Sequence, residues 1–247
     1  MMPTMEPPSP EDDPAEAPPV AVPADVAPGG APIAQSSLTA TRKDLQLGRR
    51  LVHCANGCAI ATAYALIFTH QQIVHTFGSI ACLVYILDRV RIHYPELLER
   101  APWINRLLFR AEEEFKESAM TPYAIAILLT LLTFPKTIAL IAIYTLAIAD
   151  PLSALVGITW GRRHIVQNKS VEGSLAFLAA TAAITALVLR TTTLVAPWPL
   201  AGVAFTIGLA GAVFEMLPLR LDDNLTIPLF VGFAGWTVCA LAGIVPP

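Results

Sequence analysis

Charged side chains are scarce in this chain. Only 14% of its 247 residues are Asp, Glu, Lys or Arg, whereas 55% are hydrophobic. A typical soluble domain is about 25% charged. This composition, a mean hydropathy of +0.59 and long uninterrupted apolar runs exclude a disordered protein, a nucleic-acid binder and an ordinary water-soluble enzyme.

Cysteine is also rare, and no two cysteines form a C-x-x-C pair. The four cysteines all lie in apolar runs: Cys54, Cys58, Cys82 and Cys239. Cys54 and Cys58 would share a helix face, but no His or Cys cluster completes a metal site. We therefore expect packed core thiols rather than a disulfide framework or a zinc site.

Basic residues are absent from residues 1–40, which hold six of the 19 acidic residues and ten of the 21 prolines. This segment has no apolar periodicity and lacks the basic and apolar regions of a secretory signal. We expect a disordered, Pro-rich tail, because the segment cannot bury enough surface to offset its chain entropy. The remaining domain, residues 41–247, has 13 acidic against 16 basic residues and is net basic.

Long apolar runs dominate that domain. Crossing a hydrocarbon core of about 30 Å takes roughly 20 apolar residues as helix. Candidate spans are residues 51–69, 72–88, 121–135, 137–160, 173–190, 197–219 and 226–245. Residues 89–118 are charged and amphipathic instead, as in a helix that lies on the membrane surface. The sequence therefore predicts an all-α integral membrane protein with about seven transmembrane helices and one interfacial helix.

The basic residues orient these spans. If the N-terminus is cytoplasmic, 14 of the 16 basic residues fall in cytoplasmic segments, and only Lys136 and Arg190 fall outside. Cytoplasmic loops of membrane proteins carry such an excess of Lys and Arg. We expect a cytoplasmic N-terminus and an outer C-terminus.

Carboxylates within or beside a span are costly and therefore suggest function. Counting helix rise from the outer ends places Asp150 and Glu215 toward the cytoplasmic edge, near the pair Asp222 and Asp223. Oxygen ligands that converge in this way suit a divalent cation. Taken singly, Asp150 could equally hydrogen-bond between helices, and Glu215 could pair with Arg220.

A basic, Gly-containing loop follows Asp150. Its glycines allow close backbone approach, and its cations can neutralise phosphate. The residues concerned are Gly157, Gly161, Arg162, Arg163, Lys169 and Ser170. The helices that start after Ser170 and near Asn224 point their positive dipole ends to the same side. Asn224 or Thr226 could cap the last of them, and by itself the loop could be an ordinary positive-inside loop.

Two features lie nearer the N-terminus. Arg50 and His53 stand at the cytoplasmic edge of the first span, where a lipid or phosphate contact or a plain interface histidine would fit. Glu112 and Glu113 follow Arg110 and could be either a solvated helix face or part of a site.

The order of these motifs resembles the membrane-embedded polyprenol and diacylglycerol kinases, which include dolichol kinase, phytol kinase and CTP-dependent diacylglycerol kinase. The resemblance covers roughly residues 45–245. It rests on four runs: Arg49-Arg50-x-x-His53, Arg110-x-Glu112-Glu113, Ala149-Asp150-Pro151 through Lys169-Ser170-Val-Glu172-Gly173-Ser174, and Glu215-Met-Leu-Pro218 with Asp222-Asp223-Asn224-Leu-Thr226. The family often has Gly before the motif Asp and a further Ala or Thr after it, where this chain has Ala149 and Pro151.

The resemblance implies transfer of the γ-phosphate of CTP to a lipid alcohol at the cytoplasmic face. The implied Mg²⁺ ligands are Asp150, Asp222 and Asp223, and Arg162, Arg163, Lys169 and Ser170 would hold the phosphates. Glu215 is the candidate metal ligand or base, and Glu113 is a weaker one. Diacylglycerol, a polyprenol or phytol would serve as acceptor. No nucleic acid is expected as partner, and a homo-oligomer is left open.

The sequence leaves two alternatives open. Phosphatidate cytidylyltransferase shares the central motif but ends in an Asp-Arg-x-Asp-Ser motif, where this chain has Asp222-Asp223-Asn224-Leu-Thr226. A small transporter would use Asp150 and Glu215 as ion sites, but transporters commonly carry internal repeats and midplane sites. This sequence shows no clear repeat, and its acids lie at one edge.

Overall fold

The computed structural model describes residues 33–94, 96, 120–166, 169–219 and 221–244. The chain divides into two units, Met1–Lys43 and Asp44–Pro247. Of the first unit only residues 33–43 are described, and they are helical although the sequence assigns residues 33–40 to a disordered tail. The rest of the helix that begins at Ile33 and all later helices of the described residues belong to the second unit.

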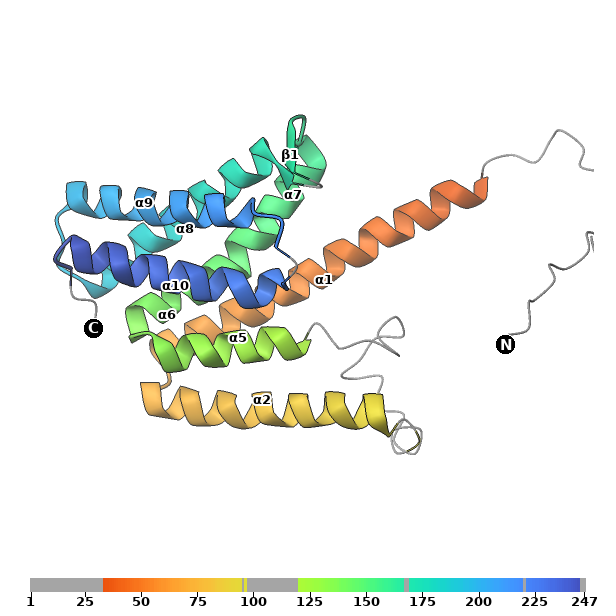
Figure 1. Ribbon diagram of the computed structural model, residues 1–247, viewed down its shortest axis with the longest axis horizontal. Helices are drawn as coiled ribbons and strands as arrows, with labels where there is room; N and C mark the ends of the chain where they lie inside the picture. The colour runs from red at the N-terminus through yellow and green to blue at the C-terminus, as the bar shows by residue number, and fades with distance from the viewer. Residues whose placement is uncertain (1–32, 95, 97–119, 167–168, 220, 245–247) are drawn as a thin grey trace, which may run out of the picture. The chain divides into compact units, whose positions relative to one another are not determined.

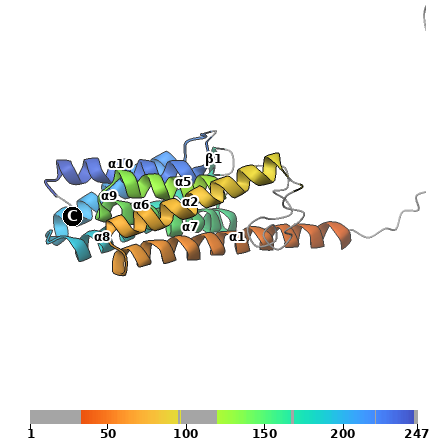
Figure 2. The same cartoon turned by 90° about the horizontal axis from the view of Figure 1, so that it is seen from below.

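The described chain is almost entirely helical (Figure 1). In chain order its elements are α1 (Ile33–Leu66), α2 (His70–His93), α5 (Met120–Thr133), α6 (Lys136–Tyr144), the π-helix η2 (Thr145–Ala149), α7 (Asp150–Trp160), β1 (His164–Val166), β2 (Lys169–Ser170), α8 (Val171–Thr192), α9 (Pro197–Glu215) and α10 (Asp223–Leu241). β1 and β2 pair antiparallel in a short hairpin between α7 and α8. Turned by 90°, the helices of the second unit run roughly along one common direction (Figure 2).

Five helices are long and apolar enough to cross a membrane. They are His70–His93, Lys136–Trp160, Val171–Thr192, Pro197–Glu215 and Asp223–Leu241. This is the pattern of an all-α, multi-pass membrane protein, as the composition predicts. The predicted count of seven is not confirmed, because α5 has only 14 residues and α1 is not among these five.

The sequence explains why α5 is short and why α1 is not among the five long apolar helices. α5 ends at Thr133, two residues before Pro135, and the residue before a proline is driven out of the helical region. The apolar half of α1 is interrupted by Arg50, His53 and Asn56, which lower its hydropathy. Its inward face nevertheless joins the core through Ala61 and Tyr64, both fully buried.

Polar and close contacts align α1 antiparallel to the broken helix α6–η2–α7. Lys136 Nζ donates to the carbonyl oxygen of Ala65 at 3.2 Å. Farther along, the hydroxyls of Thr62 and Tyr144 are 2.9 Å apart. The start of α1's apolar half therefore lies at the same end of the molecule as α7.

Asp88, Arg91 and Thr121 tie α2 to α5. Arg91 Nη2 donates to Asp88 Oδ1 at 2.8 Å, and Thr121 Oγ1 donates to Asp88 Oδ2 at 2.9 Å. Residues 89–93, predicted to begin an interfacial helix, thus complete the last turn of α2. Apart from Glu96 and that turn, the predicted interfacial segment lies outside the described residues before α5.

The π-helix η2 directly precedes Asp150. Pro151 in the first turn of α7 has no N–H, and its ring crowds the carbonyl four residues earlier. A wider π turn accommodates both the missing N–H and the proline ring, and such turns are frequent at functional sites. The sequence predicts one 137–160 helix here, and the structure shows a helix that changes its winding at its acidic residue.

The cysteines are free thiols, as expected. Only Cys239 is a buried core thiol, whereas Cys54 and Cys58 are half-buried and Cys82 is exposed.

Candidate functional site

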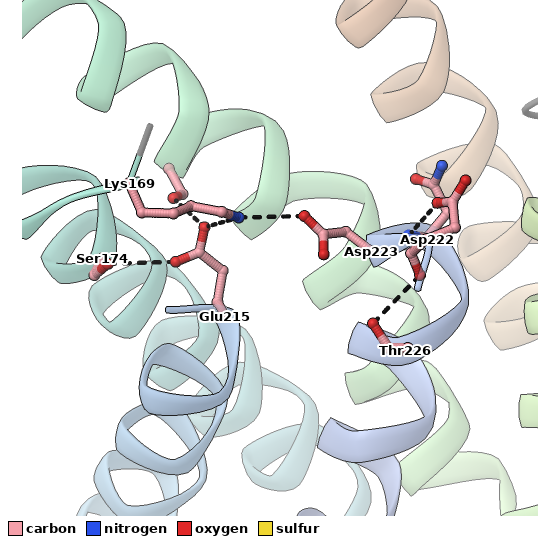
Figure 3. A network of polar contacts seen from close by, with 8 residues as sticks. Lys169, Ser174, Glu215, Asp222, Asp223 and Thr226 are labelled. Atoms are coloured by element: carbon pink, nitrogen blue, oxygen red, sulfur yellow. Dashed lines mark hydrogen bonds and ion pairs between the residues drawn. The ribbon is translucent and has the colours of Figure 1, made fainter. Parts of the chain in front are cut away.

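A polar cluster gathers where α7, α8, α9 and α10 meet at one end of the helices (Figure 3). Lys169 comes from β2, Glu215 from the last residue of α9 and Asp223 from the first residue of α10. Three segments far apart in the sequence thus contribute one cation and two carboxylates to one small volume.

Lys169 bridges the two carboxylates. Its Nζ lies 2.6 Å from Glu215 Oε1 and 3.2 Å from Asp223 Oδ2. The exposed fraction of the side chain is 32% for Lys169, 3% for Glu215 and 49% for Asp223. The cluster therefore runs from a buried carboxylate to a solvent-facing one, with the ammonium between them.

The surroundings of Lys169 favour its charged form. Burial alone would lower its pKa, but the hydrogen bond and charge of Glu215 and the charge of Asp223 outweigh burial and raise the pKa above the ordinary lysine value. Lys169 is thus an ammonium at neutral pH, suited to binding phosphate and unsuited to acting as a base.

Two serine hydroxyls complete the shell around Glu215. Ser153 Oγ of α7 donates to Oε1 at 3.4 Å, and Ser174 Oγ of α8 donates to Oε2 at 3.3 Å. Both serines are buried. Both oxygens of the Glu215 carboxylate are therefore held by donors from neighbouring helices, which orients the carboxylate.

Asp150 belongs to the same electrostatic group. Its carboxylate interacts with the charges of Lys169, Asp223, Glu215 and Arg50. Because Arg50 comes from α1, the charges that act on Asp150 come from α1 as well as from the Lys169 cluster. The predicted convergence of Asp150, Glu215 and Asp223 at one end of the helices agrees with this arrangement.

The turn from α7 to α8 depends on glycines packed around Ser170. Ser170 caps α8 by accepting a hydrogen bond from the Gly173 N–H at 3.1 Å. A Cβ on Gly161 would stand 2.8 Å from Ser170 Oγ, closer than real Cβ atoms come. The sequence places Gly157 in a loop, but Gly157 lies in α7, and the loop begins at Gly161.

Arg162 and Arg163 are anchored by their backbones. Both N–H groups donate to Glu172 Oε2, at 3.2 and 3.4 Å, and both side chains are exposed. The exposed guanidinium groups can reach a ligand from solvent. Their predicted contact with phosphates stays a prediction.

Asp222 is the N-cap of α10. Its Oδ1 accepts from the Asn224 N–H at 2.8 Å, and its carbonyl accepts from the Thr226 hydroxyl at 3.3 Å. The prediction of Asn224 or Thr226 as the cap is therefore wrong. Asp222 precedes both residues, in the extended conformation that an N-cap needs.

On the α1 side, His53 faces α5, and Arg50 interacts with the charge of Asp150 in α7. The rings of His53 and Tyr123 lie 4.4 Å apart, tilted by 56°. The sequence does not predict Tyr123 as a site residue, nor does it predict Ser153 and Ser174. Weak signals exist for the two serines: Ser153 follows Asp150 by one helical turn and so shares its face, and Ser174 ends the third run that carries the resemblance.

Glu112 and Glu113 lie outside the described residues. Within the described ranges, no three His, Cys, Asp or Glu side chains form a group that could hold a metal ion. The donor chemistry still fits Mg²⁺, which in phosphoryl-transfer sites takes one or two carboxylates and completes its shell with phosphate oxygens and water. Asp150 and Asp223, whose charges interact, are the carboxylates that would take part in such a site.

Comparison with known proteins identifies one curated relative and no function. No family model matches the chain. An uncharacterized protein of Methanocaldococcus jannaschii is 27% identical over 196 residues, which cover 76% of this chain and 91% of that protein. No solved structure matches.

Proposed function

We propose that this protein is a membrane-embedded lipid kinase that transfers the γ-phosphate of CTP to the hydroxyl of a lipid alcohol. The observation that carries the proposal is the Lys169–Glu215–Asp223 cluster at one end of apolar helices, beside Asp150. An ammonium, several carboxylates and adjacent helix N-termini are what phosphoryl transfer demands, because that reaction needs positioning and charge neutralisation more than covalent chemistry.

Each residue then has a task. The nucleotide phosphates compete with Glu215 and Asp223 for the Lys169 ammonium, assisted by Ser170 and the guanidinium groups of Arg162 and Arg163. Asp150 and Asp223, with Asp222 beside them, would hold Mg²⁺, which neutralises charge on the β- and γ-phosphates when bound.

In the transfer itself, the lipid hydroxyl oxygen forms a bond to the γ-phosphorus as the bond from that phosphorus to the bridging oxygen breaks. CDP leaves, and the hydroxyl proton passes to a carboxylate. Glu215, oriented by Ser153 and Ser174, is the proposed acceptor of that proton once Lys169 has turned to the phosphates. The lipid chains stay among the apolar helices, and the hydroxyl reaches the cluster from the side.

The proposed topology has seven spans. It adds α1 and α5 to the five long helices and puts the N-terminus and the polar cluster on the cytoplasmic side. Support comes from the distribution of Lys and Arg over the loops. A cytosolic nucleotide could then reach Asp223 and the exposed arginines directly.

A double-label assay tests the reaction. Membranes containing the full chain are incubated with CTP labelled at the α or the γ phosphate, with Mg²⁺ and diacylglycerol, a polyprenol or phytol. We expect γ label in one of the lipids and none from the α position. Transfer of α label with release of pyrophosphate would instead identify a cytidylyltransferase, and no label in any lipid would contradict both enzymes.

Substitutions connect that activity to the cluster. Asp150→Asn and Asp223→Asn should each lower transfer at least 100-fold, because each removes a carboxylate that would coordinate the metal ion. Membrane insertion should be unchanged. Lys136→Gln, at the other end of the helices, is the matched control and should retain activity. Full activity in both aspartate variants would show that the metal assignment is wrong.

A further inference from the structure

Two buried hydrogen-bond donors at the α1 side of the site lack a partner among the described residues. They are Arg50 Nη1 and the hydroxyl of Tyr123. Tyr123 is only 9% exposed. Buried donors are nearly always hydrogen-bonded, because leaving one unmade forfeits the hydration it had in the unfolded chain. Two such donors beside a charged cluster therefore point to a ligand that accepts from both.

Helix periodicity and a ring contact place both donors on the same side of α1. Arg50, His53 and Gly57 share one face of α1, and the ring of Tyr123 packs against His53. The Tyr123 hydroxyl lies 2.9 Å from where a Cβ on Gly57 would be, and Ala147 Cβ lies 2.6 Å from the same point. Only glycine at position 57 lets α1, α5 and the π-helix meet so closely.

Asp150 lies near this side of α1. It lies three residues after Ala147 and interacts electrostatically with Arg50. The Lys169 ammonium already has two carboxylates within hydrogen-bond distance, whereas Arg50 keeps a buried N–H without a partner in the described part of the chain. A new anion therefore finds an available cationic donor at Arg50 without displacing an existing contact.

Exposed apolar side chains follow Arg50 in α1, around the helix from the face that carries Arg50. The next two residues of α1, Leu51 and Val52, are 62% and 54% exposed. A ligand that offers phosphate oxygens to Arg50 and Tyr123 can lay an alkyl chain along these side chains. Free phosphate or a nucleotide offers the oxygens but no chain.

We propose that Arg50 and Tyr123 bind the phosphate monoester of an alkyl lipid. This inference rests on the proposed function, in which that monoester is the phosphorylated product and the same donors receive the transferred group on the acceptor side. The guanidinium binds two of its oxygens, and the tyrosine hydroxyl donates to one. Lys169 and Arg50 would then hold the nucleotide and the lipid on opposite sides of Asp150.

Calorimetric titration of the purified full chain in detergent tests the proposal. The probes are decyl phosphate below its micelle concentration, decanol, inorganic phosphate and CTP. Wild-type protein should bind decyl phosphate more than about tenfold more tightly than either decanol or inorganic phosphate. Tyr123→Phe should weaken decyl phosphate about fivefold to tenfold, the effect of one hydrogen bond, and leave CTP binding unchanged. Arg50→Gln should weaken it more.

Tyr85→Phe, at an exposed tyrosine of α2, is the matched control and should bind decyl phosphate like wild type. Unchanged decyl phosphate affinity in both Tyr123→Phe and Arg50→Gln would overturn the inference, as would equal affinity for inorganic phosphate. If decyl phosphate binds as expected but no label transfers from CTP, the lipid-phosphate site is supported and the proposed kinase activity is contradicted. If label transfers but the Tyr123 and Arg50 variants bind decyl phosphate like wild type, the kinase activity is supported and the proposed lipid-phosphate site is contradicted.

Discussion

At the scale of single residues, Lys169 is the centre of the site. It is the cation that contacts both a 3%-exposed carboxylate and a solvent-facing one. Removing one partner of a buried ion pair is more harmful than removing both, because the remaining charge is left without compensation. Lys169 is thus expected to stabilise the fold as well as to bind phosphate.

Lys169→Met should lower the free energy of unfolding by about 1–3 kcal/mol, since it leaves Glu215 buried without its cation. Thermal unfolding in detergent would show this as a lower Tm. The double variant Lys169→Met with Glu215→Gln should recover part of the loss. Arg190→Met, at an exposed position near the far end of α8, should stay within about 0.5 kcal/mol of wild type. A Tm for Lys169→Met equal to that of Arg190→Met would contradict a structural role for the pair.

The pH dependence of that stability follows from the raised pKa of Lys169. A lysine whose folded pKa exceeds its unfolded value, about 10.4, contributes stability that is fully present below that value. The contribution is lost as pH rises through the folded pKa. Between about pH 6 and 9 the Tm difference between wild type and Lys169→Met should therefore not change through titration of the lysine.

At the scale of elements, glycines decide how closely the helices approach. A Cβ on Gly57 would meet Ala147 Cβ at 2.6 Å, so α1 packs on the π-helix through a residue with no side chain. Small residues play this part between membrane helices, where packing rather than hydrophobic burial drives association. On α9, by contrast, a Cβ on Gly202 would meet nothing within 4 Å.

Gly57→Ala should therefore destabilise the protein by about 1–3 kcal/mol through overpacking. It should also reduce lipid-phosphate binding, because it displaces the Tyr123 hydroxyl. Gly202→Ala should be neutral or slightly stabilising, since alanine is the better helix former. Thermal unfolding of the two variants side by side distinguishes them, and equal Tm values would show that α1 does not pack as described.

The apolar runs of the sequence, together with its prolines and capping residues, predict most elements to within a few residues. Prolines explain the end of α5 and the disturbance before α7, and Ser170 has the residue type of an N-cap. The sequence misses the β1–β2 hairpin, because two- and three-residue strands carry no period. It also misses that Asp222 caps α10, since Asp222, Asn224 and Thr226 are all competent residue types and only the backbone conformation selects one.

At the scale of the whole molecule, the broken helix α6–η2–α7 and the helices α8, α9 and α10 run alternately in opposite directions (Figure 1). This alternation places the ends of α7 and α9 and the starts of α8 and α10 at the same side. Because basic residues also concentrate in the segments at that side, the proposed orientation puts the cluster in the cytoplasm.

Cysteine labelling tests this topology. In a background without native cysteines, Asp44→Cys, Tyr94→Cys, Arg162→Cys and Leu221→Cys should react with a membrane-impermeant maleimide only in inside-out vesicles. Thr69→Cys and Leu194→Cys should react only in right-side-out vesicles. Labelling of Asp44→Cys and Thr69→Cys from the same side would show that α1 does not cross, and the seven-span topology would be wrong.

The sequence by itself determined the membrane class, the approximate limits of the apolar helices and the end at which the acids and bases gather. Hydropathy, proline positions and helix rise are local quantities, so they can be read along the chain. Only the tertiary structure decided that Lys169 bridges Glu215 and Asp223, that Ser153 and Ser174 orient Glu215, and that Tyr123 packs against His53. Such contacts join residues far apart in the sequence, and they depend on helix rotation and packing depth, which no periodicity along one segment specifies.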